Sequence, residues 1–383
     1  MKQSEDTGSL GRLGTFFARV AIVLASIVAT LLFCEMLVRV IAPTETLTRF
    51  NDDYHGLKGV RPDIHGFHQI PDTFRKTYST SAQRFRGSRM FSPEAPSGTL
   101  RIAVLGDSFT FGWGADDDET YPAVLERILG KTMGPVEIIN AGALGDGTGD
   151  EALWYDAWVS AFHPKLVILT VVPNDTDDDL ARTLFTIDSK REAHPLSPQQ
   201  LQGYQQSQRG FARIVQAIPG YEYLGEHSQL LSLFRRVVSL KIRTHRISQW
   251  QQGQTIRAYK TVGLPLLGAE VAWLNKRVQQ DGAKLVVTFV PFRDTIYGDP
   301  HAPKPALDKP GEMITVLTKV CAAEGIPFLD MTPEFHTEAA ADKLPLYYMT
   351  KYDSHPTPEG YRFMAENLAS FLSQQLHQPQ AQR

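Results

Sequence analysis

The chain has 383 residues, of which 42% are hydrophobic and 21% are charged. These values are ordinary for a globular protein and exclude a largely disordered chain. Lysine and arginine number 39 against 42 aspartate and glutamate residues, so no strong overall charge favours nucleic acid as a partner. The length suits one catalytic domain with additional elements. The two cysteines, Cys34 and Cys321, predict no disulfide, structural zinc or iron–sulfur cluster.

The first element is an apolar run, FFARVAIVLASIVATLLFC, at residues 16–34. It is about as long as a helix that crosses the roughly 30 Å hydrocarbon core of a bilayer. The basic residues at its start are Lys2, Arg12 and Arg19, and by the positive-inside rule they keep the N-terminus cytoplasmic. We expect residues 1–15 in the cytoplasm, an anchor at 16–42, and an extracytoplasmic catalytic domain, which is periplasmic in a Gram-negative cell.

Other interpretations of this run fit less well. A cleaved signal peptide needs a shorter apolar core and small residues at the cleavage site, whereas CEMLVRVIAP follows at residues 34–43. A lipoprotein needs small residues before Cys34, where Leu32 and Phe33 stand. A buried core helix is disfavoured by the length and the terminal position of the run. We therefore favour an uncleaved single-pass anchor.

Residues 43–98 are rich in proline, glycine and charge, and we interpret them as a linker with short extended pieces. Residues 99–376 then alternate apolar runs with amphipathic ones. The expected strands are 101–106, 136–140, 165–172, 284–291 and 326–330, and the expected helices are 121–129, 149–162, 265–280, 312–324 and 358–374. Strands rich in valine, isoleucine and leucine are typical of parallel sheets covered on both faces. The pattern predicts a three-layer α/β/α fold with a five-stranded parallel sheet and right-handed crossovers.

An insertion at residues 176–264 interrupts this alternation, and we expect it to be helical. Its stretch 230–246 places apolar residues at helical spacing beside the basic residues Arg235, Arg236, Lys241, Arg243 and Arg246. Two interpretations stay open: a solvated helix that packs on the core, and a helix that lies on a membrane surface or forms a lid. The tail at 377–383 is predicted to be disordered.

Polar residues gather where the predicted strands end. They are Gly106-Asp107-Ser108, Asn140 with Gly145-Asp146, Pro173-Asn174-Asp175, and Asp353-Ser354-His355-Pro356 before the last helix. In a doubly wound sheet the carboxyl ends of the strands form the ligand-binding edge. A lone serine there is more often a helix cap than a nucleophile. The four groups together, however, contain every part that acyl transfer requires.

Acyl transfer assigns a role to each of these residues. Ser108 needs a base to become a nucleophile, and His355 can accept its proton. Asp353 is the candidate carboxylate that holds the imidazole in the required tautomer. The backbone N–H groups of Ser108 and Gly145 and the side-chain amide of Asn174 are candidate oxyanion donors. We expect Asp107 to brace the turn and not to react.

These segments also resemble a known family. RIAVLGDSFTFG, NAGALGD, PND and DSHPTPEGY, in this order, resemble the four blocks of the SGNH, or GDSL, hydrolases over about residues 100–180 and 265–375. The resemblance implies a flavodoxin-like α/β/α sandwich and supports the same roles for the matching residues. Asp353 lies two residues before His355. The common spacing in the family is three residues, and in this chain that position is occupied by Tyr352. The shorter spacing also resembles membrane-linked acetyltransferase-like members of the alginate O-acetylation type. Pro173 is a smaller difference from the family pattern, because many members have glycine or threonine before the asparagine, and it concerns only the local backbone geometry.

The sequence leaves three functions open. The first is an esterase or deacetylase that removes O-acyl groups from envelope glycans or lipids through an acyl-enzyme on Ser108. The second is an O-acetyltransferase that acylates an extracytoplasmic polysaccharide, possible partners being a glycan acceptor and a membrane acyl-transfer protein. The third is a glycan-binding or scaffold protein without catalysis, because a fold does not fix a function. No cofactor is expected.

A metal-dependent hydrolase is a further class to consider. Acidic runs occur at Asp175, Asp177, Asp178 and Asp179 and at 116–119. We interpret both as solvated charges of a loop or of a helix start, where carboxylates are favoured. No histidine pair at ligand spacing accompanies them, so no metal is predicted.

Overall fold

A computed structural model describes residues 6–41, 51–54, 57–70, 73–182, 184–197, 199–201, 218–235, 237, 257–298, 309–341, 345–348 and 355–377. The chain divides into two units, one of residues 1–48 with 210–249 and one of residues 49–209 with 250–383. The second unit contains the central sheet and is here called the catalytic domain.

The sheet of the catalytic domain has five parallel strands. They are β5 (Leu100–Gly106), β6 (Val136–Asn140), β7 (Leu166–Val171), β10 (Lys284–Phe289) and β11 (Phe328–Asp330), and their order is β11-β10-β7-β5-β6. This confirms the predicted parallel sheet. The chain continues from β5 to β6 on one side and then to β7 on the other, so the strand order reverses around β5. Ligands of open α/β sheets bind beside such a reversal, at the carboxyl ends of the strands.

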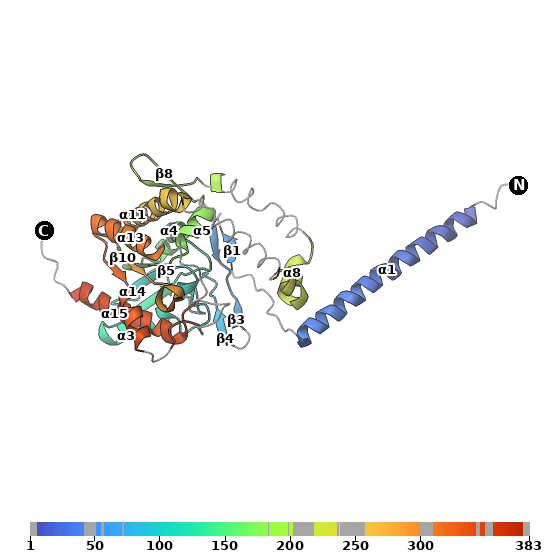
Figure 1. The fold of residues 1–383 in the computed structure, drawn as a ribbon, viewed down its shortest axis with the longest axis horizontal. Helices are drawn as coiled ribbons and strands as arrows, with labels where there is room; N and C mark the ends of the chain where they lie inside the picture. The colour runs from blue at the N-terminus through green and yellow to red at the C-terminus, as the bar shows by residue number, and fades with distance from the viewer. Residues whose placement is uncertain are drawn as a thin grey trace. The chain divides into compact units, whose positions relative to one another are not determined.

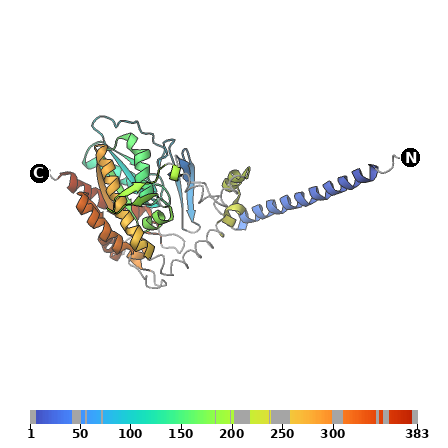
Figure 2. The ribbon, with the colours of Figure 1, turned by 90° about the horizontal axis from the view of Figure 1, so that it is seen from above.

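Helices cover both faces of this sheet and complete the predicted three layers (Figure 1, and from a second direction Figure 2). Neighbouring side chains of β5 point to opposite faces, so Ala103 and Leu105 join one apolar core while Ile102 and Val104 join the other. The helices of the first core are α4 (Thr148–Ala157), α11 (Leu264–Gln280) and α13 (Lys309–Glu324). Those of the second are α3 (Tyr121–Thr132), α14 (Thr332–Ala340) and α15 (Pro358–His377).

The segment before the sheet contains two antiparallel hairpins. One pairs β1 (Asn51–Tyr54) with β2 (Leu57–Val60), and the other pairs β3 (His65–Ile70) with β4 (Phe74–Ser79). The extended pieces that the sequence indicates are therefore present. Buried side chains of these strands, such as Val60 and Tyr78, and Phe85 after them join the apolar clusters of the catalytic domain. This part of the chain thus packs on the domain as well as connecting to it.

The insertion contributes strands as well as helices to the catalytic domain. Helix α5 (Asp175–Arg182) is followed by a hairpin of β8 (Phe185–Ile187) and β9 (Ala193–Pro195), whose Phe185 ring lies 5.2 Å from the Trp273 ring of α11. A π-helical turn, η2 (Tyr259–Gly263), leads into α11. The short helix η1 (Val159–Phe162) follows α4, and the short helix α12 (Arg293–Tyr297) follows β10.

The other unit contains the N-terminal helix α1 (Asp6–Ile41) and the short helix α8 (Tyr221–His227). Within α1, Thr15–Ile41 is a stretch of 27 residues that is long and apolar enough for a membrane span, and an N-terminal signal sequence has the same character. After Ser228 the chain is helical again over residues 229–235. The predicted tail lies outside the described residues from residue 378 onward.

Candidate active site

A sharp turn presents Ser108 at the carboxyl end of β5. The strand ends at Gly106, and helix α2 (Ser108–Phe111) begins two residues later. A Cβ atom at Gly106 would lie 2.0 Å from Thr110 Oγ1, so this turn has room only for glycine. Asp107 caps the helix because its Oδ1 accepts the N–H of Phe109 at 2.8 Å. This is the bracing role expected from the sequence, and it leaves the Ser108 hydroxyl at the edge of the sheet.

Ser108 and His355 meet at this edge. The Oγ of Ser108 lies 2.8 Å from Nε2 of His355, within hydrogen-bonding distance. His355 precedes α15, and its carbonyl accepts the N–H of Tyr348 at 3.0 Å. The rings of Phe109 and Trp113 have their centroids 5.2 and 5.9 Å from the imidazole. The hydrogen bond from Tyr348 holds the backbone of His355, and aromatic side chains of α2 and of the loop after it lie beside the imidazole.

Asp107 is a second polar neighbour of Ser108. Its Oδ2 lies 3.2 Å from the serine Oγ, so two acceptors compete for one hydroxyl hydrogen. The contact with His355 is shorter. Burial raises the pKa of Asp107, while hydrogen bonds from the Phe109 N–H and other groups oppose that rise.

The expected oxyanion donors lie on the two loops beside this turn. Asn174 follows β7, its amide donates to Asp178 Oδ2 at 2.6 Å, and its hydrogen bond to Asp107 lowers the pKa of that carboxyl. Gly145 lies in the loop after β6 and has a φ of +70°, which favours glycine. The N–H of Ala143 in the same loop donates to Gly106 O at 3.0 Å. Both loops are therefore tied to the serine turn.

Asp353, the expected partner of His355, lies outside the described residues, as does Tyr352. The role of Asp353 and its spacing therefore stay predictions. Hydrogen bonds bring together Ser108, His355, Asp107 and Asn174, and the N–H of Ala143 ties the Gly145 loop to them.

Arg86, which the sequence analysis did not single out, holds the loop after the nucleophile. Its side chain is 2% exposed, and its Nε lies 2.7 Å from Asp117 Oδ1. Its guanidinium also donates to the carbonyls of Phe111 at 3.1 Å and Ala115 at 2.9 Å. Burial lowers the pKa of Arg86, and the charge of Asp117 opposes this effect. The residue comes from the segment interpreted as a linker, where an arginine gives no sign of burial.

His68 is a second buried residue from that segment. Its ring stacks between Tyr78 and Trp113, with centroids 4.5 and 4.1 Å away, and its Nδ1 accepts the N–H of Gly114 at 3.1 Å. Burial, together with the positive charges of Arg86 and His355, lowers its pKa to about 2. A histidine that stays neutral at every physiological pH supports Trp113 and is not a proton acceptor for the serine.

A carboxyl cluster lies beneath the loops of Gly145 and Asn174. Its members are the buried residues Asp146, Asp150, Glu151, Asp175, Asp179 and Glu270, and Arg182 pairs with Asp150. The Oδ2 of Asp175 accepts from the Thr148 hydroxyl at 3.2 Å. A Cβ at Gly149 would lie 2.6 Å from a Glu270 oxygen, so α4 approaches α11 closely at that glycine. Both oxygens of Glu151 are buried without a hydrogen-bond partner.

The cluster corrects one sequence interpretation. Asp175 does begin helix α5, but Asp175 and Asp179 are buried and not solvated, because α4 and α11 pack over them. Burial is the main cause that raises the pKa of Glu151, Asp175 and Glu270 well above the ordinary range, and neighbouring carboxylates add to it. Burial likewise raises the pKa of Asp179 to about 8.

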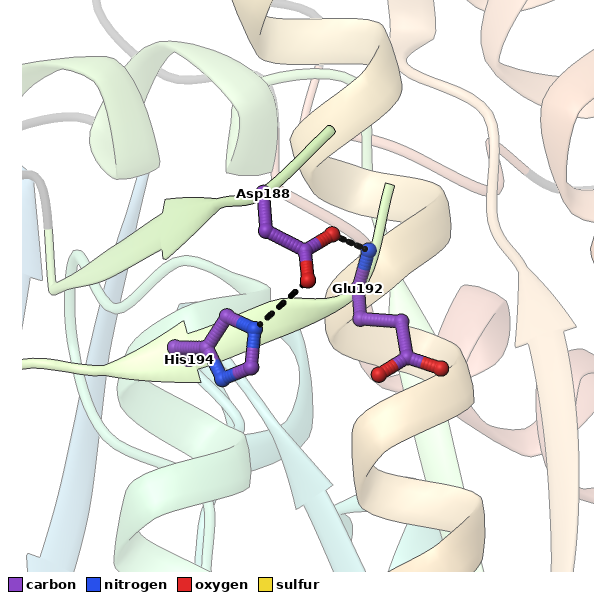
Figure 3. A group of neighbouring side chains, drawn as sticks. All are labelled: Asp188, Glu192 and His194. Atoms are coloured by element: carbon purple, nitrogen blue, oxygen red, sulfur yellow. Dashed lines mark hydrogen bonds and ion pairs between the residues drawn. The ribbon is translucent and has the colours of Figure 1, made fainter. Parts of the chain in front are cut away.

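The turn between β8 and β9 brings Asp188, Glu192 and His194 together, as Figure 3 shows. Among the described residues, these exposed side chains are the group whose ligand atoms lie close enough to hold a metal ion. The Asp188 carboxylate accepts the N–H groups of Lys190 and Glu192 at 2.8 and 3.0 Å and lies 3.1 Å from His194 Nε2. These contacts close the hairpin turn, which accounts for the grouping.

Comparison with protein families now identifies the class of the chain. Residues 104–363 match the family model of the GDSL-like lipase/acylhydrolases, and this span covers more than half of the sequence. The chain belongs to the GDSL-like lipase/acylhydrolase family. It is therefore an enzyme of the serine hydrolase type, as the sequence predicted. No curated protein matches the chain.

Several solved structures resemble it at low sequence identity. An acetylxylan esterase from Geobacillus stearothermophilus, solved as a catalytic mutant, is 14% identical, with 73% of this chain and 95% of that one covered and a TM-score of 0.39. A psychrotrophic esterase from Pseudoalteromonas sp. is 13% identical, with 72% and 98% covered and a TM-score of 0.39. An α/β hydrolase from the metagenome of Lake Arreo, Spain, is 12% identical, with 72% and 95% covered and a TM-score of 0.41.

Proposed function

We propose that this enzyme hydrolyses O-acyl esters of envelope glycans or lipids through an acyl-enzyme on Ser108. The observation that carries the chemistry is the distance of 2.8 Å between Ser108 Oγ and His355 Nε2 at the carboxyl end of β5. A serine hydroxyl is a weak nucleophile at its ordinary pKa and needs a base within hydrogen-bonding reach. A neutral imidazole at this distance supplies that base.

In the first half-reaction the serine oxygen attacks the ester carbonyl carbon while its proton passes to His355 Nε2. The carbonyl oxygen becomes negative in the tetrahedral intermediate. We assign its stabilisation to the N–H groups of Ser108 and Gly145 and to the amide of Asn174. Removal of one such donor typically costs about 3–4 kcal/mol of transition-state stabilisation. The carbon–oxygen bond of the ester then breaks, and the leaving alcohol takes the proton from His355.

In the second half-reaction water attacks the acyl-enzyme. His355 accepts a proton from the water, the tetrahedral intermediate forms again, and the acid leaves as Ser108 Oγ recovers its hydrogen. We assign to Asp353 the task of accepting the Nδ1 hydrogen of His355, which fixes the tautomer and stabilises the imidazolium. The Asn174 amide donates to both Asp178 and Asp107, which holds its plane, so the hydrogen bond to Asp107 must be released when that amide donates to the oxyanion.

The proposed substrate class depends on the N-terminal helix. If Thr15–Ile41 crosses the membrane with its N-terminus inside, as the basic residues before it favour, the domain lies on the outer face. An enzyme anchored there meets glycans and lipids of the envelope before it meets cytosolic metabolites. Transfer of the acyl group to a sugar hydroxyl uses the same acyl-enzyme and is the second proposal.

A two-step assay on the full chain in detergent micelles tests both. A fluorophosphonate probe should label the native enzyme and not Ser108→Ala, and p-nitrophenyl acetate should be hydrolysed only by the native enzyme. Acetylated glycans should then release acetate without an acceptor. Incorporation of acetyl groups into an added glycan, without release of free acetate, would show transfer instead. Absence of both labelling and turnover would contradict both versions.

A further inference from the structure

An acidic side chain near the end of the apolar helix α1 has its partners about 190 residues later in the sequence. The carboxylate of Glu35 accepts hydrogen bonds from the Ser228 hydroxyl at 2.7 Å and from the N–H groups of Gln229 and Leu230 at 2.9 and 3.0 Å. These groups start the helical segment 229–235. Glu35 therefore caps the N-terminus of that segment from a different helix.

Arg39, one turn further along α1, binds the end of α8. Its Nη2 donates to the carbonyl of His227 at 2.7 Å, and its Nε lies 2.8 Å from Glu35. A cation at the carbonyl end of a helix and an anion at the amide end of the next are both favourable for the helix dipoles. The two side chains together satisfy the backbone groups on both sides of Ser228.

The segment held in this way is a compact helical hairpin, defined here as residues 218–237. The guanidinium of Arg235 lies 5.5 Å from the Tyr221 ring, and the Ser232 hydroxyl lies 3.5 Å from the Gly225 carbonyl. Gly225 and Ser232 are buried in this contact. The hairpin therefore has an inner face, where its two helices touch.

The hairpin also exposes large apolar side chains. Five of them are between 48% and 65% exposed: Ile218, Tyr223, Leu224, Phe234 and Val237. So many exposed apolar groups on about 20 residues are characteristic of an interaction site. Tyrosine and arginine together are typical of the membrane–water boundary, and the sequence continues with the basic residues Lys241, Arg243 and Arg246.

We propose that the hairpin 218–237 inserts its apolar side chains into the outer leaflet that the end of α1 crosses. This inference rests on the membrane location in the proposed function. At 1.5 Å per residue the 27 residues of Thr15–Ile41 extend about 40 Å, beyond the roughly 30 Å of hydrocarbon. The last turns of α1 therefore reach the headgroups, and Glu35 and Arg39 hold the hairpin at that level.

A lipid bilayer fits this surface better than a protein partner does. The hairpin is bound to the end of the membrane span. Its exposed aromatic and aliphatic groups therefore lie beside the acyl chains, and no other protein is needed to bring them to the bilayer. The basic residues that follow suit the phosphate groups of anionic lipids. An amphipathic element of this kind commonly lies within the interface and does not cross the membrane.

The test uses the full chain in vesicles of phosphatidylcholine and phosphatidylglycerol. A nitrobenzoxadiazole label is placed at Phe234→Cys in a background of Cys34→Ala and Cys321→Ala, and quenching by lipids with a doxyl group near the headgroup is measured. Matched labels at Thr315→Cys, exposed on α13, and at Val28→Cys, central in α1, mark water and bilayer. We expect quenching at position 234 to exceed that at 315 by roughly twofold or more.

Equal quenching at positions 234 and 315, with quenching by deep doxyl lipids at position 28, would overturn the proposal. Absence of quenching at position 28 would overturn the location and this inference with it. Hydrolysis of p-nitrophenyl acetate by the same samples reports on the Ser108 chemistry alone, so the two failures are distinguishable.

A second variant tests the cap. Glu35→Gln removes the charge and one acceptor oxygen, so the hairpin should detach in part and quenching at position 234 should fall towards that at 315. Hydrolysis should be unchanged, because Glu35 belongs to the other unit. Unchanged quenching in Glu35→Gln would show that the Glu35 contact does not hold the hairpin at the leaflet.

Discussion

The serine edge and the carboxyl cluster are neighbouring polar regions of one domain, and they use polar groups in opposite ways. At the edge, the hydroxyl of Ser108 has specific partners in His355 and Asp107. In the cluster, Arg182 pairs with Asp146 and Asp150, and both oxygens of Glu151 lack a hydrogen-bond partner. The edge is ordered around one hydroxyl, whereas the cluster contains closely packed acids, four of which have a raised pKa: Glu151, Asp175, Asp179 and Glu270.

This difference shows that a displaced pKa is a weak guide to catalysis. The strongest displacements upward among the described carboxyls belong to the cluster, where desolvation and mutual repulsion cause them. Perturbed groups are common at active sites, but structural networks perturb them too. The geometry around Ser108 distinguishes the two regions, and four substitutions test that distinction.

The largest effect is expected for Ser108→Ala. Loss of the nucleophile should reduce kcat for p-nitrophenyl acetate roughly 10⁴- to 10⁶-fold, as in other serine hydrolases, with little change in the melting temperature. Ser92→Ala, an exposed serine in the same domain, is the matched control and should keep full activity. Retention of more than a few per cent of activity in Ser108→Ala would place the nucleophile elsewhere.

His355→Asn comes second. The amide cannot accept the serine proton, so kcat should fall roughly 10³- to 10⁵-fold while the fold is maintained. The control is His163→Asn, because His163 is exposed and has a φ of +46°, a conformation that asparagine tolerates. Steady-state kinetics over a range of pH check this prediction. A fall in kcat of less than tenfold would contradict proton transfer to His355.

Arg86→Met tests whether a buried charge supports the edge. Its removal leaves Asp117 with its hydrogen bonds from Ser79 and takes a donor from two loop carbonyls, and breaking a buried pair typically costs about 3–5 kcal/mol of folding stability. Denaturant unfolding measures this cost. Arg362→Met removes a half-exposed arginine whose partners on the same helix, Glu359 and Glu366, are partly exposed too, and it should cost less than about 1 kcal/mol. Equal costs for the two variants would show that the Arg86 contacts do not stabilise the domain.

The smallest effect is expected in the cluster, for Asp179→Asn. The pKa of Asp179 is about 8 in the folded protein, above the ordinary value of 3.8. The folded state therefore binds more protons than the unfolded state between these values, and stability falls as the pH rises. The asparagine oxygen can still accept the Gly149 N–H, which Asp179 Oδ1 binds at 2.9 Å.

The variant should therefore match the native protein near pH 4 and be more stable by about 1–3 kcal/mol at pH 8. Thermal unfolding at the two pH values measures this, and kcat should stay within a factor of about two. Asp118→Asn, an exposed carboxyl before α3, is the control and should show no such pH dependence. A loss of stability at pH 8 in Asp179→Asn would mean that its charge is stabilised in the fold.

Sequence patterns predict the sheet because each strand is a run of valine, isoleucine and leucine bounded by turn residues. They predict Ser108 and His355 because reactive residues follow strands or precede the last helix in a fixed order. The burial of Asp175 and Asp179 could not be predicted in this way. It depends on Glu270 and the rest of α11, which pack against α5 and α4 although they lie about 90 residues later in the chain.

Arg86 and His68 were missed for a related reason. Both come from a segment without hydrophobic periodicity, and their importance arises from tertiary contacts with residues 111–117. An arginine in a proline-rich and glycine-rich stretch is usually solvated. Local sequence therefore predicts the candidate reactive groups and their order, whereas the groups that support them become visible only after the hairpins are placed.

The contact at Glu35 also bears on how the enzyme could be shed from a membrane. The chain passes between its two units three times, near residues 48, 209 and 249. A single proteolytic cut between α1 and β1 would remove only the first of these connections. The hairpin would still hold the end of α1 through Glu35 and Arg39. If α1 anchors the enzyme as proposed, release of the catalytic domain therefore requires both a cut and the loss of the noncovalent contacts of Glu35 and Arg39.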